Sequence, residues 1–333
     1  MIIKPIAKKL LGESNYIALR NIRYSKAVGF LNIASSFPKE IVQQRLNFPY
    51  FAFDFRSKIG MGAMLTHITL LLAYAEEKGL IPVCRISNPH FADGSDAFDT
   101  FLVAKRTPEP GRKMYFHYVR TPDYTRFKPR VEPLLNEMNR IFFKYFDFSE
   151  RVYEIVNRVV ADCVPPGPRI GIHYRGTDKV FEAPNVSYEA VFEAVDHYCN
   201  ESSVSQIFLA TDSNGFAEAI KTRFPHINFI SYYSGPVVNS EVPRHFSSLS
   251  GEDKAVEAVV NIILLARCDI CIRTASQLSA WSRILNKDLK TVTLNRTYYE
   301  EKYPEMQVWE ESLRPALGKS MRKDGGTDIP VAT

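Results

Sequence analysis

The sequence lacks the features that would cross-link the chain by disulfides or anchor it in a membrane. Its five cysteines are an odd number scattered over 333 residues, and a chain of this size needs no disulfides to support a core. No apolar run approaches the ~20 residues that span a bilayer, and Met1 to Pro5 lack the apolar region of a signal peptide. These absences predict a cytoplasmic protein, one bound peripherally at a membrane, or a catalytic fragment without its anchor.

Metal-binding patterns are also missing. Cys268 and Cys271 form one Cys-x-x-Cys, but no second pair completes a zinc site. Because they stand in an apolar segment, burial in the core is the favoured interpretation. No Asp-x-Asp occurs anywhere in the chain. The sequence therefore predicts that no metal is bound.

The charge is too mild to indicate a nucleic-acid partner. The formal net charge is +5, and 45% of the residues are hydrophobic, which is typical of a packed globular protein. Residues 1–165 carry 24 Lys and Arg against 16 Asp and Glu, whereas residues 166–333 carry 18 against 21. The basic first half fits an anionic acceptor or a membrane surface, and scattered solvated lysines explain it equally well.

What the sequence does contain is a short apolar stretch that ends abruptly in polar residues. Arg169 to Tyr174 is predicted to be a buried strand. His173 and Arg175 stand two positions apart, so both point to one side while the strand stays extended. Gly176 permits a sharp turn, and the planar guanidinium of an arginine matches phosphate oxygens. Because ligands of open α/β sheets bind beyond the carboxyl ends of the strands, we expect a phosphate site here; a surface loop with internally paired charges is an equal alternative.

Strands and helices alternate through the rest of the chain. Strands are expected at 50–55, 81–84, 114–119, 169–174, 206–210, 227–232 and 291–295, and helices at 68–78, 132–148, 149–162, 187–198, 213–223 and 254–266. Residues 269–277 are expected to run from a strand through a loop into a further helix. This alternation predicts an α/β protein with parallel, doubly wound sheets. We expect an N-terminal Rossmann-like domain over residues 1–165, a second domain over 166–317, and a flexible tail over 318–333.

The central stretch also resembles a known family. His173 to Lys179, His-Tyr-Arg-Gly-Thr-Asp-Lys, resembles the motif His-x-Arg-Arg-Thr-Asp-Lys of the α1,6-fucosyltransferases, which include N-glycan core and rhizobial nodulation enzymes. The resemblance implies that Arg175 holds the β-phosphate of GDP-fucose. The second arginine is absent, because Gly176 stands there, so its role must be met elsewhere or not at all. The family's catalytic glutamate follows the motif one residue later than Glu182 does. Glu182 is therefore the expected base, and Asp178 is the alternative.

A second stretch of the chain resembles the same family. Lys58, Gly60, Gly62, Leu65 and His67 resemble a Lys-Gly-x-Gly-x-Gly-x-x-Leu-His-like stretch that opens a long apolar helix. The resemblance implies that the glycine loop 58–67 approaches the pyrophosphate and sugar of the donor from the first domain. A single Gly-x-Gly often serves only tight packing, and a core histidine is the slightly favoured interpretation of His67.

A third match lies near residue 270. Asp269, Thr274, Ser276 and Gln277 resemble the family pattern Asp-φ-φ-φ-Cys-Thr-x-Ser-Ser-Gln, in which φ is apolar, with one residue fewer in the loop. The resemblance implies that Thr274, Ser276 and Gln277 contact the donor. Ser276 and Gln277 would stand at a helix N-terminus, which suits a phosphate.

Two further positions concern the nucleotide. Thr211-Asp212 resembles a Leu-Ala-Thr-Asp stretch of the family, but capping of the helix 213–223 is the favoured role of Asp212. Asn261 stands where a helix aspartate of the family binds the base or the ribose. This departure leaves the specificity for guanine open.

The resemblance covers about residues 56–85 and 166–295. It implies a GT-B glycosyltransferase, in which two Rossmann-like domains face each other across a cleft. The donor would be GDP-fucose and the acceptor a glycan or glycoconjugate. Without cofactor or metal, Arg175, His173 and Ser276 would stabilise the leaving diphosphate while Glu182 or Asp178 deprotonates the acceptor during inversion at C1. An enzyme using another nucleotide sugar and a non-catalytic binding protein are the alternatives.

Overall fold

The structure is a computed structural model that describes residues 46–94, 96–120, 127–163, 167–176, 182–202, 204–234, 249–298 and 303–313. Asp178, the expected domain boundary at Pro165 and the expected tail 318–333 lie outside these residues. The strands are β1 (Tyr50–Phe55), β2 (Ile81–Ile86), β3 (Leu102–Ala104), β4 (His117–Val119), β5 (Phe146–Phe148), β6 (Arg169–Tyr174), β7 (Gln206–Thr211), β8 (Asn228–Ile230), β9 (Ile270–Arg273) and β10 (Lys290–Thr293). The helices are α5 (Met61–Glu77), α6 (Phe98–Phe101), α7 (Leu135–Tyr145), α8 (Glu150–Cys163), α9 (Tyr188–Ser202), α10 (Asn214–Arg223), α11 (Gly251–Ala266), α12 (Gln277–Leu285) and α13 (Glu305–Glu311).

The larger sheet has five parallel strands in the order β10-β9-β6-β7-β8. The chain runs outward from β6 through β7 to β8, returns to the other side of β6, and continues through β9 to β10. The order therefore reverses between β6 and β9, and such a reversal leaves a crevice beyond the carboxyl ends of those two strands. The predicted phosphate stretch 173–176 begins at this crevice.

Both faces of the larger sheet are covered by helices, as the alternation of elements predicts. Side chains alternate across a strand, so Ile207 and Leu209 of β7 pack in the cluster with α9 and α10, whereas Phe208 and Ala210 pack in the cluster with α11. The prediction of an α/β fold with parallel sheets is confirmed.

The smaller sheet is also parallel, in the order β2-β1-β4. Its central strand β1 is buried along its whole length, because the aromatic residues at 51, 53 and 55 face α5 and its other face is also covered. A two-stranded antiparallel ribbon, β3-β5, stands beside it.

Several expected helices have different ends in the structure. α5 begins at Met61, seven residues before the expected start at residue 68. The helix expected over 132–148 is confined to α7, and Phe146–Phe148 instead forms β5. The pattern Phe-Asp-Phe has the two-residue period of a strand, and pairing with β3 satisfies its backbone groups.

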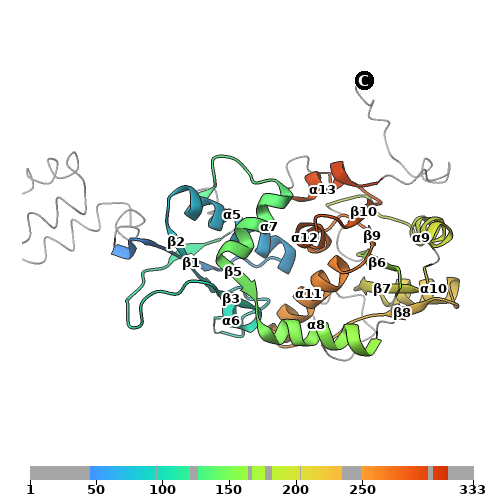
Figure 1. Cartoon of the computed structure of the whole chain (residues 1–333), viewed down its shortest axis with the longest axis horizontal. Helices are drawn as coiled ribbons and strands as arrows, with labels where there is room; N and C mark the ends of the chain where they lie inside the picture. The colour runs from blue at the N-terminus through green and yellow to red at the C-terminus, as the bar shows by residue number, and fades with distance from the viewer. Residues whose placement is uncertain are drawn as a thin grey trace, which may run out of the picture.

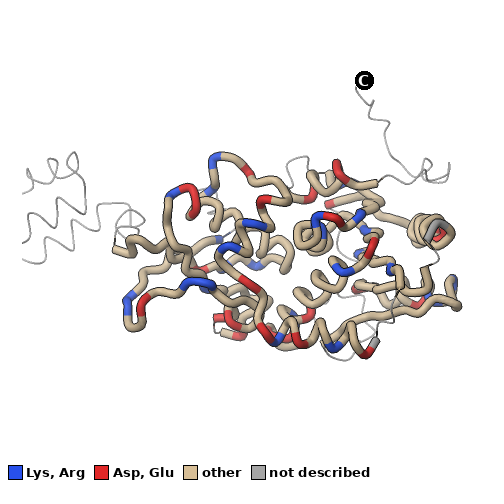
Figure 2. The backbone as a smooth tube through the Cα atoms, viewed as in Figure 1, with Lys and Arg blue, Asp and Glu red and all other residues tan. Residues whose placement is uncertain are grey.

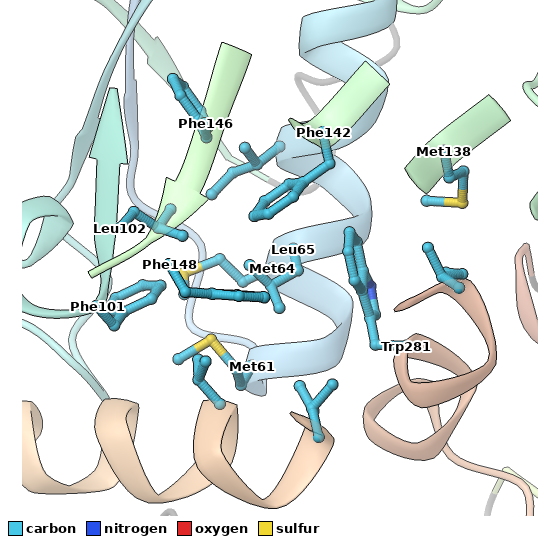
Figure 3. Packing of buried hydrophobic residues seen from close by; sticks show 14 of the residues in the cluster. Met61, Met64, Leu65, Phe101, Leu102, Met138, Phe142, Phe146, Phe148 and Trp281 are labelled. Atoms are coloured by element: carbon cyan, nitrogen blue, oxygen red, sulfur yellow. The ribbon is translucent and has the colours of Figure 1, made fainter. Parts of the chain in front are cut away.

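Helices α5, α7, α11 and α12 lie between the two sheets (Figure 1). They share one hydrophobic cluster that draws residues from both halves of the sequence. Trp281 of α12 is fully buried, lies beside Met64 and Leu65 of α5, and donates a 3.0 Å hydrogen bond from Nε1 to Thr66 Oγ1 (Figure 3). The two halves are therefore joined by a continuous core and not by a linker alone.

Charged residues of both signs are interspersed over the described part of the molecule (Figure 2). Many of them form exposed ion pairs, such as Arg223 with Asp196 and Arg140 with Glu76. Within the described residues, no helix is both long and apolar enough to cross a membrane.

Candidate functional site

A cavity of about 470 Å³ lies where the carboxyl ends of strands from both sheets converge. On the side of the smaller sheet it is lined by residues 58–63, His67 and Phe91. On the side of the larger sheet it is lined by His173, Tyr174, Arg175, Glu182, residues 210–212, Tyr233, Lys254, Glu257, Ala258, Asn261 and residues 276–278. The glycine loop 58–67 and the residues His173, Arg175 and Glu182, which were predicted separately, thus meet at one cavity.

The end of β6 supplies His173 and Arg175, as predicted. His173 is buried, and the side chain of Arg175 is 17% exposed. The Nε of Arg175 lies 3.6 Å from Oδ2 of Asp212, which follows β7. A carboxylate on Nε orients the guanidinium plane at the cavity wall, and the same guanidinium can donate to phosphate oxygens.

The expected capping role of Asp212 is wrong. Helix α10 begins at Asn214, and Ser213 is its N-cap, whose Oγ accepts a 3.2 Å hydrogen bond from the N–H of Phe216. Asp212 instead faces Arg175 and lines the cavity. Because the helix starts one residue later than expected, the capping oxygen comes from the serine and the aspartate belongs to the site.

Thr274 and Gly176 do not line the cavity, although both were expected to bind the donor. The N–H of Thr274 donates to the carbonyl of His173 at 3.0 Å, and Thr274 Oγ1 accepts from the N–H of Arg175 at 3.0 Å. Thr274 therefore ties the end of β9 to the end of β6 and positions Arg175. A Cβ on Gly176 would lie 2.8 Å from the ring of Tyr174, so glycine lets that ring pack beneath the turn.

Ser276 and Gln277 stand at the start of α12 and line the cavity, as predicted. Ser276 is the N-cap residue, and its Oγ accepts from the N–H of Leu278 at 3.4 Å. The turn at Ser276 is held by the buried Arg273. Its guanidinium donates to the carbonyl of Ser276 at 2.7 Å and forms an ion pair with Glu305 at 2.6 Å. The N-terminal turn of α12 is thereby presented to the cavity.

The two glycines of the 58–67 loop differ in what surrounds them. A Cβ on Gly62 would lie 2.3 Å from backbone atoms of Gln277 and Leu278, whereas one on Gly60 would meet nothing within 4 Å. Gly62 is therefore required for the close approach of α5 to α12, which is the packing role that a single Gly-x-Gly often has. Gly60 faces open space at the cavity and is the N-cap of α5, whose first turn receives no side-chain cap. The N-termini of α5 and α12 thus converge, and the backbone N–H groups of such turns favour anions.

One face of α11 forms a further wall. Lys254, Glu257 and Asn261 follow at helical spacing and line the cavity together. Glu257 is buried, and its Oε2 accepts from the N–H of Ser234 at 2.8 Å and from its Oγ at 2.9 Å. Nδ2 of Asn261 donates to the carbonyl of Tyr232 at 3.4 Å, and its buried Oδ1 has no partner among the described residues. Lys254 and Glu257 were not predicted; their helical spacing from Asn261 places them on its face of α11, but a charged residue on a helix is usually solvated.

Glu182 also lines the cavity, as expected for a base. Its carbonyl accepts a 2.9 Å hydrogen bond from the N–H of Tyr298, and the carbonyl of Pro184 accepts one of 2.7 Å from Asn295 Nδ2. These contacts fix the backbone on which Glu182 stands to the segment that follows β10.

His67 of α5 lines the cavity and packs on Phe55, with ring centroids 6.3 Å apart. Burial lowers the pKa of His67 to about 4. The imidazole is therefore neutral at physiological pH and adds no positive charge to the cavity.

Cys268 and Cys271 are buried core residues, as predicted, and burial raises the pKa of both thiols. Among the described residues, no group of three or more His, Cys, Asp or Glu side chains could hold a metal ion.

Residues 134–298 match the family model described as Nodulation protein Z (NodZ). The matched segment is just under half of the chain and contains β6, Arg175, Glu182, α11 and the start of α12. The resemblance to fucosyltransferases that include nodulation enzymes is therefore confirmed over this segment. No curated protein sequence matches the chain.

Solved structures similar to the chain include several fucosyltransferases. The fucosyltransferase NodZ from Bradyrhizobium is 17% identical, with a TM-score of 0.47, over 71% of this chain and 94% of that one. POFUT1 in complex with GDP is 10% identical, with a TM-score of 0.46, over 74% and 99% of the two chains. A mutant of FUT1 from Arabidopsis thaliana in complex with GDP is 12% identical, with a TM-score of 0.44, over 87% and 78%.

Proposed function

We propose that the chain is a fucosyltransferase that moves fucose from GDP-fucose to a hydroxyl group of a glycan or glycoconjugate. The observation that carries this proposal is the position of Arg175. It stands in the segment that matches the NodZ family, at the reversal point of the larger sheet, and lines the same cavity as the glycine loop of the smaller sheet.

The donor's diphosphate would lie against Arg175 and His173. Arg175 offers paired donors to the β-phosphate. The backbone N–H groups at the starts of α5 and α12 add further donors, together with Ser276 Oγ. Absence of Asp-x-Asp from the sequence supports a mechanism in which these groups, without metal, stabilise the leaving diphosphate.

The nucleobase of the donor would lie along α11. Guanine presents two adjacent donors, N1–H and the N2 amino group, and a carboxylate is the natural acceptor for such a pair. The resemblance implies that Asn261 stands in place of the family's aspartate, and Glu257, one helical turn before it, lines the same cavity. We assign the recognition of guanine to Glu257, with the amide of Asn261 beside it.

Transfer would proceed with inversion at C1 of fucose. Glu182 takes the proton of the acceptor hydroxyl, the hydroxyl oxygen forms a bond to C1, and the bond from C1 to the β-phosphate oxygen breaks. The bonding electron pair leaves with GDP, whose charge Arg175 stabilises. Asp178 remains the alternative base.

A panel of nucleotides tests the donor. Binding stabilises a fold by mass action, so GDP should raise the melting temperature more than UDP, ADP or CMP do, and EDTA should not diminish the shift. A larger shift with UDP would contradict the proposal, and loss of the GDP shift in EDTA would contradict the metal-free mechanism.

A second candidate is an enzyme of the same fold that uses another nucleotide sugar. Asn261 and Gly176 favour it, because both depart from the family's motifs at positions where the resemblance implies donor-binding residues. The same panel separates the two candidates.

A further inference from the structure

Position 176, in the turn after β6, has no space for the second arginine of the family's motif. A Cβ on Gly176 would lie 2.8 Å from Cε1 and from the hydroxyl oxygen of Tyr174. That ring cannot easily move away, because its hydroxyl donates to the carbonyl of Val186 at 3.0 Å and its face stacks on Phe216 with a centroid distance of 4.1 Å. A side chain at position 176 would have to displace a buried tyrosine. Positive charge beyond Arg175 must therefore reach the diphosphate from another element.

Two lysines line the same cavity from other walls. Lys58 stands in the loop between β1 and α5, and Lys254 stands near the start of α11. Within the described part of the chain, neither ammonium group lies within ion-pair distance of a carboxylate. Arg175, in contrast, is paired with Asp212. The cavity thus has two lysine side chains that form no direct ion pair with a described residue, although Glu182, Asp212 and Glu257 line the same cavity.

Both lysines affect the same side chain, that of His90. His90, in the loop after β2, has its pKa lowered by burial and further by the positive charges of Lys58 and Lys254. Both side chains line the same cavity, Lys58 on the side of the smaller sheet and Lys254 on the side of the larger sheet, and their charges act on the same imidazole. The uncapped N-terminus of α5 begins two residues after Lys58.

We propose that Lys58 and Lys254 together bind the terminal phosphate of the donor's diphosphate and supply the charge that a second arginine would otherwise place there. The inference rests on the proposed function. An ammonium group is a point charge on a flexible stem, so two lysines from separate elements can converge on one phosphate without the fixed fork geometry of arginine. Their charge would also offset the negative charge that develops on GDP as the bond to C1 breaks.

Calorimetric titration with GDP, GMP and guanosine tests the inference. Lys58→Met and Lys254→Met should each weaken GDP binding about 10-fold, which corresponds to one lost charge-assisted contact. The double variant should weaken it about 100-fold, with GMP and guanosine affinities changed less than about 3-fold. Lys290→Met is the matched control, because Lys290 is exposed at the amino end of β10 and does not line the cavity.

Failure of the inference and failure of the proposed function would give different binding results. If the wild type binds GDP and the double variant keeps the wild-type ratio of GDP to GMP affinity, the inference is overturned and the proposed function stands. An effect confined to the KM of the acceptor, with donor binding intact, overturns it as well. If the wild type binds no GDP, the proposed function itself is wrong, and the inference is overturned with it.

Discussion

Glu182 combines a fixed backbone with an acidic side chain at the cavity, which is what a general base needs. Glu182→Gln preserves size and hydrogen-bonding capacity but cannot accept the proton. We therefore expect kcat to fall at least ~100-fold while GDP affinity changes little. Steady-state kinetics and calorimetry on the same variant measure the two quantities.

Asp178→Asn is the comparison for this prediction. If Glu182→Gln keeps most of its turnover while Asp178→Asn loses it, the base is Asp178. Equal retention of turnover in both variants would remove the carboxylate base from the mechanism.

The second prediction for a single residue concerns Arg175. Its Nε lies 3.6 Å from Asp212, which leaves the planar end of the guanidinium to meet a phosphate. Lys has one charged nitrogen and cannot contact both groups in this way. Arg175→Lys should therefore bind GDP at least ~10-fold more weakly than the wild type, and Arg175→Ala should do the same. A lysine variant with native affinity and turnover would show that charge alone suffices.

His67 links the site to the pH dependence of stability. Its pKa is about 4 in the folded protein against 6.5 for an ordinary histidine. Between these values the unfolded chain binds a proton that the folded chain does not. The stabilisation is therefore complete above pH ~6.5 and is lost as the pH falls toward 4, by about 3 kcal/mol.

Denaturant unfolding at pH 7.5 and pH 5 measures this effect. His67→Gln should flatten the dependence, whereas the exposed His226→Gln should leave it unchanged. An unchanged slope in His67→Gln would assign the acid sensitivity to other groups.

At the scale of elements, the contact between α5 and α12 decides whether the cavity forms. A methyl group on Gly62 would lie 2.3 Å from backbone atoms of α12, and backbone cannot turn aside as a flexible side chain can. Gly62→Ala should therefore lower the free energy of unfolding by about 1–3 kcal/mol, even though alanine favours helix. Gly60→Ala, whose methyl group meets nothing within 4 Å, is the control and should fold normally. Equal stability of the two variants, measured by urea denaturation, would mean that the helices are not in close contact.

Elements whose signals are local could be predicted from the sequence, and some of them to the residue. β6 was expected at 169–174 and is found there, because an apolar run between prolines and a glycine marks both ends. The end of α7 could not be predicted. Phe146 to Phe148 are too short a pattern to be separated from the aromatic face of the preceding helix, and their pairing with β3, more than 40 residues earlier, makes them a strand.

The residues of the candidate site could likewise be predicted where they belong to a local motif. His173, Arg175, Glu182, Ser276 and Gln277 carry recognisable motifs and line the cavity. Tight packing was one expected role of the Gly-x-Gly, but the helix on which Gly62 packs could not be derived, because it is remote in the sequence: Thr66 and Trp281, which join the same two helices, are 215 positions apart. Glu257 was missed because a glutamate on a helix is usually solvated, and only the folded arrangement shows it buried.

At the scale of the whole molecule, the two sheets share one hydrophobic cluster through α5, α7, α11 and α12. The stretches 58–63 and 276–278 therefore lie at the N-terminal ends of two helices whose close contact is part of the protein's own core. We infer that the wall formed by α5 and α12 is preformed and that donor binding requires no rearrangement of these helices.

The central claim is that this cavity consumes GDP-fucose. The most direct test is incubation of the protein with GDP-fucose labelled in the sugar and a panel of glycan acceptors, followed by separation of free donor, free fucose and fucosylated product. The account predicts a fucosylated product from at least one acceptor, formed in the presence of EDTA and lost in Arg175→Ala. Consumption of another nucleotide sugar in place of GDP-fucose, or equal product from the wild type and Arg175→Ala, would contradict it.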